Sequence, residues 1–325
     1  MDIVSEKYIN PFTDFGFKKL FGTEVNKDLL MDFLNEMIRG KEGKIIELKY
    51  LNAEQLGRTE FDRKAVYDIY CETDCGEKLI VEMQKAKHNF FVDRTVFYAT
   101  FPIREQAIKG EWNYELKPVY MIGVLDFTFN DDDDCYYSEV QLMNTGTKTV
   151  FYKKLTFINL EMPKFNKEID QLETHFDKWM YVLKNLPRLQ NLPPQLQERV
   201  FQKIFQVAEI AKMDKSEMVE YEESLKNYRD LFSVIDTAKK EGIEEGLEKG
   251  EVIGLKKGEA ERNKLKAEKE TAQLKLETEK AEKEATMKKV VIECNKAGLP
   301  PETISSITGL PTQDIEKLLE KLENT

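Results

Sequence analysis

The chain has 325 residues, of which 34% are charged and 10% are aromatic, and this composition excludes a disordered protein. Its length allows more than one domain with a core of its own. The formal net charge of −11 argues against indiscriminate binding of nucleic acid, because phosphate contacts need lysine and arginine gathered on one face.

The first residues lack the basic and apolar regions of a leader, and no apolar run approaches the ~20 residues that span a bilayer. The cysteines Cys71, Cys75, Cys135 and Cys294 are scattered, which is typical of free thiols in a reducing compartment. We therefore expect a cytoplasmic protein without membrane contact.

Two short helices are predicted at the start of the chain. Thr13 is a good N-cap for the first helix, Phe12 and Phe17 have the spacing of a hydrophobic staple, and Gly22 ends it. Apolar residues at helical spacing predict the second helix, over about residues 30–39. Both helices are expected to pack on a sheet.

The predicted sheet begins with strands over residues 44–51, 65–73 and 78–86, and the second and third of these form a hairpin. A helix is expected after residue 90, although Pro102 should kink or break it. Further strands are predicted over residues 119–127, 135–143 and 153–162.

After Pro163 the sequence predicts helices, most clearly over residues 176–186 and 199–211. Five glycines then follow at intervals of four, at positions 242, 246, 250, 254 and 258. Residues 259–287 are dominated by Glu, Lys and Ala, which indicates a solvated helix or a weak coiled coil. The tail has two short helices around Gly309 and is acidic, so contact with a protein is favoured over contact with DNA.

Acidic residues interrupt the predicted hairpin. Because side chains alternate along a strand, Glu82 and Gln84 share one face, and the pairing places Asp68 roughly opposite Glu82. Two carboxylates from neighbouring strands, supplemented by a backbone carbonyl, are a suitable ligand set for Mg²⁺ or Mn²⁺, and Gln84 could orient a water. A second interpretation stays open, in which the acids pair with Lys64 or Lys78 at the solvated end of the hairpin.

A resemblance to a known family extends this interpretation. The segments DFGFKKLF, YDIYCETDCGEKLIVEMQ and RTVFYATF occur in that order, before a helical region, glycine-spaced repeats and a charged tail. In this order the chain resembles the Rpn family of recombination-promoting nucleases, a PD-(D/E)XK nuclease family of transposases. The resemblance covers residues 1–165 well and the remainder loosely.

The resemblance implies roles for particular residues. Asp68 and Glu82 would be the two metal-binding acids, and Asp14 would match an early acidic position that completes the site. Gln84 stands where most PD-(D/E)XK enzymes carry lysine, and Lys85 points to the opposite strand face. A lysine at position 84 is accordingly expected to keep or raise activity.

The roles of the other polar residues follow less directly. Arg94 and Tyr98 match the Arg and Tyr of the family's following helix, where they contact phosphate or support Gln84, or simply link the helix to the sheet. Lys18 is interpreted as a solvated lysine. His175 has no evident partner in the sequence.

We therefore expect a restriction-endonuclease-like α/β fold, in which helices flank a mixed sheet, followed by an all-α region and a long charged helical arm. The expected domains are a nuclease-like domain (1–165), a helical domain (166–237), the arm (238–290) and a helix-turn-helix-like tail (291–325). The expected function is metal-dependent DNA cleavage in recombination or mobile-element processes. The alternative is an inactive nuclease fold that binds DNA or assembles with proteins. Self-association through the arm and a protein partner at the acidic tail are also expected.

Overall fold

The computed structural model describes residues 6–38, 44–55, 64–107, 110–129 and 134–323. The chain forms two compact units, Met1–Ile235 and Asp236–Thr325. Residues predicted as a nuclease-like domain and a helical domain lie together in the first unit. The four-part division expected from the sequence stays a prediction.

The first unit is built on a mixed six-stranded sheet. Its strands, in spatial order, are β1 (Leu48–Tyr50), β4 (Ile69–Thr73), β5 (Lys78–Gln84), β6 (Val119–Leu125), β8 (Thr149–Glu161) and β7 (Tyr137–Asn144). The pairs β5–β6 and β6–β8 are parallel, and the other pairs are antiparallel. The strands β2 (Glu54–Gln55) and β3 (Ala65–Val66) form a separate two-stranded sheet.

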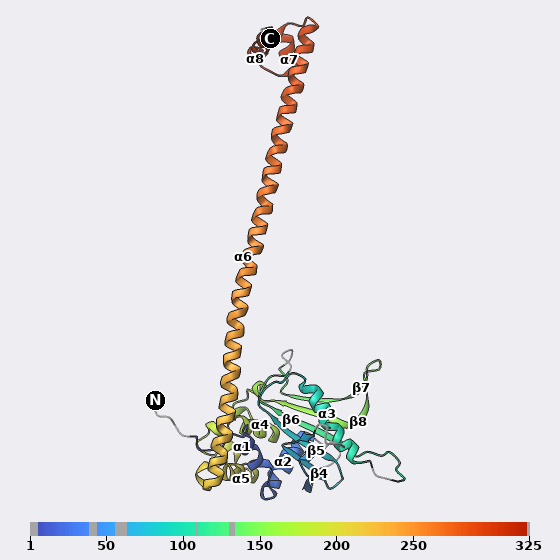
Figure 1. Cartoon of the computed structure of the whole chain (residues 1–325), viewed down its shortest axis with the longest axis vertical. Helices are drawn as coiled ribbons and strands as arrows, with labels where there is room; N and C mark the ends of the chain where they lie inside the picture. The colour runs from blue at the N-terminus through green and yellow to red at the C-terminus, as the bar shows by residue number, and fades with distance from the viewer. Residues whose placement is uncertain (1–5, 39–43, 56–63, 108–109, 130–133, 324–325) are drawn as a thin grey trace. The chain divides into compact units, whose positions relative to one another are not determined.

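Helices flank this sheet, and alternate residues of its strands enter two different cores (Figure 1). Leu79, Val81 and Met83 of β5 belong to the larger core. That core includes the helices α1 (Asp14–Phe21), α2 (Lys27–Ile38), α4 (His175–Asn185) and α5 (Arg199–Val207). Ile80 belongs to the smaller core with Phe101 of α3 (Phe91–Glu105). The predicted mixed sheet flanked by helices is confirmed.

The ends of α1 are those that the sequence predicts. The Thr13 hydroxyl accepts a hydrogen bond from the Gly16 N–H (3.0 Å), and Gly22 is the C-cap. A side chain at position 16 is excluded, because a Cβ there would lie 2.1 Å from the carbonyl oxygen of Asn10. The start of α1 is thereby held tightly against the preceding turn.

Short 3₁₀ segments connect these elements: η1 (Glu24–Asn26), η2 (Met162–Lys164), η3 (Ile169–Gln171), η4 (Leu186–Arg188), η5 (Pro194–Leu196) and η6 (Ile210–Lys212). They keep the helices close to the sheet, as short connections in compact domains do.

One expectation about the secondary structure is wrong, and one alternative of another is excluded. The predicted strand over 65–73 is divided, because the Tyr67 N–H turns away to donate to the Ala53 carbonyl (3.0 Å), and β4 starts only at Ile69. Pro102 does not end its helix, since α3 continues to Glu105. Pro102 lies close to the C-terminus of α3, where a lost backbone hydrogen bond affects few further turns.

Helix α6 (Lys215–Lys296) begins in the first unit, which includes its residues up to Ile235. The second unit contains the rest of α6, followed by α7 (Pro301–Thr308) and α8 (Thr312–Glu323), around a small core of Val291, Ile304 and Ile315. At all five regularly spaced glycines a Cβ would meet nothing within 4 Å. In the described part of the chain, no helix is both long and apolar enough to cross a membrane.

Candidate active site

The hairpin of β4 and β5 brings the two predicted acids together. The register pairs Ile69 with Val81, so Asp68 comes opposite Glu82, just before β4 begins. The Asp68 N–H faces Glu82 Oε1 at 3.4 Å. Tyr67 is not part of the β4–β5 ladder, and opposite it the Met83 N–H donates to Asp68 Oδ2 (2.8 Å). The break in the predicted strand therefore places a carboxylate at the end of the ladder.

Both carboxylates are held in surroundings that disfavour their charge. Glu82 is 5% exposed, and its burial, with the negative charge of Asp68, raises the pKa of Glu82. Burial also raises the pKa of Asp68, as does the neighbouring Asp14, while the Met83 N–H and the charges of Lys18 and Lys85 act in the opposite direction. A cation bound between the two acids would offset this cost.

The lysines proposed as partners of these acids are engaged elsewhere. Lys64 pairs with Glu54 (2.6 Å), and Lys78 pairs with Glu72 (2.7 Å). Across the described residues, neither Asp68 nor Glu82 forms an ion pair with lysine or arginine. The interpretation of a solvated hairpin end with paired acids is therefore wrong.

Gln84 and Arg94 form a chain of hydrogen bonds that ends at Glu82. The Gln84 side-chain amide donates to Glu82 Oε2 (3.0 Å), and Gln84 Oε1 accepts from Arg94 Nη2. The Arg94 guanidinium also lies over the ring of Tyr98, 5.6 Å from its centre. Since Arg94 comes from α3, this chain joins the helix to the acid on β5. Both polar ends of the Gln84 amide are used.

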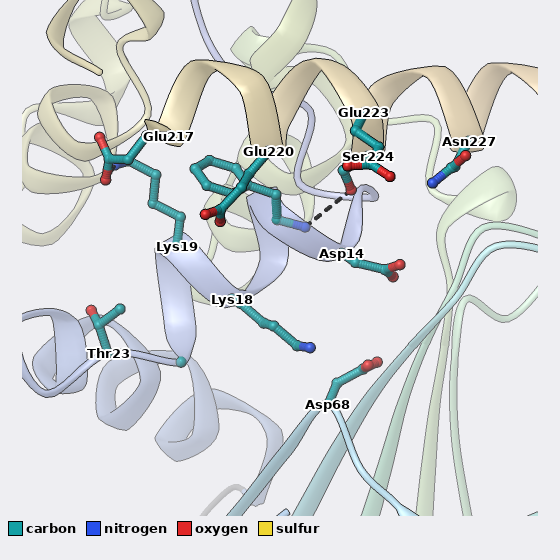
Figure 2. Close-up of a pocket in the computed structure, with 12 residues that line it drawn as sticks. Asp14, Lys18, Lys19, Thr23, Asp68, Glu217, Glu220, Glu223, Ser224 and Asn227 are labelled. Carbon is teal, nitrogen blue, oxygen red and sulfur yellow. Dashed lines mark hydrogen bonds and ion pairs between the residues drawn. The ribbon is translucent and has the colours of Figure 1, made fainter. Parts of the chain in front are cut away.

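A pocket of about 590 Å³ opens on the other side of Asp68 (Figure 2). Asp14 and Lys18 project into it from α1, one helical turn apart. Asp14 pairs with Lys85 (3.0 Å), which places the Lys85 side chain on the side of the sheet opposite α3. Asp14 therefore faces the same pocket as Asp68, with its own counter-charge already in place.

The opposite wall of the pocket is formed by residues that the sequence did not indicate. They come from the first turns of α6: Glu217, Glu220, Glu223, Ser224 and Asn227. Two hydrogen bonds fix this helix on the start of α1, from the Asn10 N–H to the Tyr221 hydroxyl (3.0 Å) and from the Phe15 N–H to Ser224 Oγ (3.1 Å). No motif marks these residues, although the helical spacing of Tyr221, Leu225 and Tyr228 could have indicated a buried face of α6.

The donor set suits one kind of metal ion better than others. Among the described residues there is no group of three His, Cys, Asp or Glu side chains that could hold a metal ion. An ion at this site would have the Asp68 and Glu82 carboxylates as its protein side-chain ligands. Mg²⁺ usually keeps several waters and binds through one or two carboxylates, so this pair of carboxylates without an ion-pair partner fits Mg²⁺ or the similar Mn²⁺.

Comparison with known proteins gives one match. The family model described as a PD-(D/E)XK nuclease family transposase matches residues 11–238. This range includes the sheet, the acid pair and the part of α6 that lines the pocket. Searches of curated proteins and of solved structures found no match.

Proposed function

The chain belongs to the PD-(D/E)XK nuclease family of transposases, and from this premise we propose that it is a metal-dependent DNA endonuclease. Membership gives a nuclease-like function with DNA as the substrate. The observation that carries this proposal is the pair of the buried Glu82 and the half-buried Asp68, neither of which forms an ion pair with lysine or arginine in the described part of the chain. A structural acid pair of this kind would be costly without a cation.

The proposed reaction is the hydrolysis of a phosphodiester. A water oxygen forms a new bond to phosphorus, one bridging P–O bond breaks, and the departing oxygen takes up a proton. Mg²⁺ or Mn²⁺ bound at the site would polarise a phosphate oxygen and lower the pKa of a water. Asp68 and Glu82 would hold this ion, and the Met83 N–H fixes the orientation of the Asp68 carboxylate.

Gln84 acts on Glu82 in this proposal. Its amide donates to one Glu82 oxygen and receives a hydrogen bond from Arg94, so it holds the carboxylate in a single orientation. Arg94 was expected to contact phosphate or to support Gln84, and this hydrogen bond favours support of Gln84. Asp14 would act from the edge of the pocket, where it positions Lys85 and adds negative charge beside Asp68.

The test is nicking of supercoiled plasmid DNA by the purified full-length chain. Cleavage is expected with Mg²⁺ or Mn²⁺ and should stop when EDTA removes the ion. Asp93→Asn is a matched control, because Asp93 is an exposed acid in the first turn of α3 and lies outside the pocket. Cleavage that persists in EDTA would contradict the proposal.

An inactive nuclease fold that binds DNA or assembles with proteins is the second candidate. Glu220 and Glu223 on the pocket wall favour its lack of cleavage, since these side chains repel a scissile phosphate near Asp68, while DNA could still bind elsewhere on the chain. The same assay separates the candidates when DNA binding is measured beside it. Binding without cleavage, in either metal, would favour the second candidate.

We also propose that residues 238–290 carry self-association and that the acidic tail binds a protein partner. Exposed apolar side chains support the first part: Ile243 is 54% exposed, Leu247 70% and Leu255 60%. Light scattering of the full chain should give the mass of an oligomer, and removal of residues 238–325 should give a monomer. A full-length monomer at micromolar concentration would contradict self-association.

A further inference from the structure

Four cationic side chains lie near Asp68, Glu82 or the pocket that Asp68 lines: Lys18, Lys19, Lys85 and Arg94. Three of them are held by a partner, Lys19 by Glu217 (2.5 Å), Lys85 by Asp14 (3.0 Å) and Arg94 by Gln84. Lys18 forms no hydrogen bond or ion pair through its ammonium with any residue that the structure describes. It is therefore the cation at this pocket whose hydrogen-bond donors are free for a ligand.

The position of Lys18 is set by the rest of α1. Phe17, Leu20 and Phe21 are buried in the larger core, so the opposite face of the helix must point outward. The Thr13 cap and the contact of Phe15 with Ser224 fix the start of the helix. Figure 2 shows the Lys18 side chain extended across the pocket toward the Asp68 carboxylate. A rigid helix thus aims a free ammonium at one of the two acids.

Lys18 and Asp68 line the same pocket, whose volume of about 590 Å³ is larger than a phosphate group needs. The acidic residues Glu220 and Glu223 form the far wall and repel a phosphate. An anion that enters is therefore confined to the side of the pocket where Lys18 lies.

We infer that Lys18 is a catalytic residue that contacts the scissile phosphate, an inference that rests on the proposed nuclease function. Its ammonium donates hydrogen bonds to a non-bridging phosphate oxygen and keeps its protons throughout the reaction. As the water oxygen bonds to phosphorus and the bridging bond breaks, negative charge grows on the non-bridging oxygens, and Lys18 stabilises that charge. Gln84 cannot supply this charge, because its amide is neutral and engaged at both ends.

The first experiment compares single-turnover cleavage by Lys18→Met, Lys18→Arg and the wild-type chain. Removing one donor aimed at developing charge typically slows a reaction by about 10²–10³-fold, so this loss is expected for Lys18→Met. Binding of the same DNA should change much less, and Lys18→Arg should recover part of the rate. Lys27→Met is the matched control, because Lys27 lies at the start of α2, pairs with Glu24 and does not line the pocket. Cleavage by a folded Lys18→Met chain at the wild-type rate would overturn the inference.

A second experiment does not depend on cleavage. Acetylation of surface lysines, read by mass spectrometry with and without a DNA duplex, should show Lys18 protected by DNA and Lys27 unchanged. If the wild-type chain does not cut DNA, the proposed nuclease function fails, and protection of Lys18 still decides whether it contacts the nucleic acid. Lys18 labelled equally with and without bound DNA would overturn the inference in either case.

Discussion

Two regions of the same domain bury carboxylates in opposite ways. Asp177, at the start of α4, accepts from the Thr174 N–H (3.1 Å) and pairs with Lys167 (2.9 Å), and these contacts lower its pKa. Glu82 is also buried, but burial and the negative charge of Asp68 raise its pKa. Asp177 has inside the chain the partners that its charge requires. Among the described residues neither acid of the pair forms an ion pair, and this difference separates a carboxylate that supports the fold from a pair suited to bind an ion.

Asp32, like Asp177, is a carboxylate whose partners come from within the chain, and His175 is one of them. The sequence indicated no partner for His175, but its Nε2 lies 2.6 Å from Asp32 Oδ1, which also accepts from the Trp179 indole (2.7 Å). These contacts lower the pKa of Asp32 against the effect of its burial and raise that of His175. This site is neutralised within the chain, as a structural site is expected to be.

The largest effect is expected from removing the acids of the unneutralised pair. Asp68→Ala or Glu82→Ala should lower metal-dependent cleavage by about 10³-fold or more, because each removes a carboxylate that would hold the ion. Circular dichroism should show an intact fold. Plasmid nicking at the wild-type rate by either folded variant would show that the pair does not hold the ion and would remove the contrast with Asp177.

A smaller loss of cleavage activity is expected when the hydrogen bonds that join Arg94, Gln84 and Glu82 are interrupted. Gln84→Ala and Arg94→Met should each slow cleavage by about 10–100-fold, the usual effect of residues that orient metal ligands. The double variant should lose little more than either single variant, because both changes break the same chain. Losses that add fully in single-turnover rates would show that the two residues act separately.

Gln84→Lys places a positive charge within the same set of hydrogen bonds. The sequence alone suggested that lysine here keeps or raises activity, but the structure places Arg94 beside the side chain at position 84. A lysine would set two positive charges against each other and would lose the acceptor for Arg94. We therefore expect slower cleavage than in the wild type, measured under the same single-turnover conditions, and a faster rate would restore the interpretation from sequence.

Stability should separate the two kinds of carboxylate directly. Asp177→Ala should lower the free energy of unfolding by about 1–2 kcal/mol, because it removes the capping-box acceptor of the Thr174 N–H and leaves donors without an acceptor. Glu82→Gln should raise it at pH 8 without metal, by on the order of 1 kcal/mol, since a repelled buried charge is removed. Urea unfolding measures both. A destabilised Glu82→Gln would contradict the assignment of this acid as unneutralised.

The smallest expected effect is the pH dependence of metal binding, measured as a change in melting temperature. Burial and Asp68 raise the pKa of Glu82 from 4.5 to about 8, so between these values the folded state binds more protons than the unfolded state. Without metal, the contribution of Glu82 to stability therefore falls as pH rises through this range. Protons compete with Mg²⁺ for the same carboxylates. The rise in melting temperature on adding Mg²⁺ should be a few degrees larger at pH 8 than at pH 5.5, and an equal rise would place the ion elsewhere.

Local patterns in the sequence determined much of the fold. The cap at Thr13, the stop at Gly22 and the alternation of Ile80, Glu82 and Gln84 each depend on neighbours within a few residues. They predicted α1, the hairpin and the face on which Glu82 and Gln84 lie. The family resemblance rests on these same local segments and is confirmed by the match over residues 11–238.

Tertiary structure decided which charges remain without a partner. Nothing near Lys18 in the sequence shows that Lys85 forms an ion pair with Asp14. Nor does it show that Glu217 and Glu220 of α6, about 200 residues later, line the same pocket. Likewise, Asp68 becomes an acceptor for Met83 only because Tyr67 leaves the ladder to meet Ala53. The physical reason is that a residue's type and its local pattern depend on the nearby sequence, whereas its burial and its counter-charges come from segments that only folding brings together.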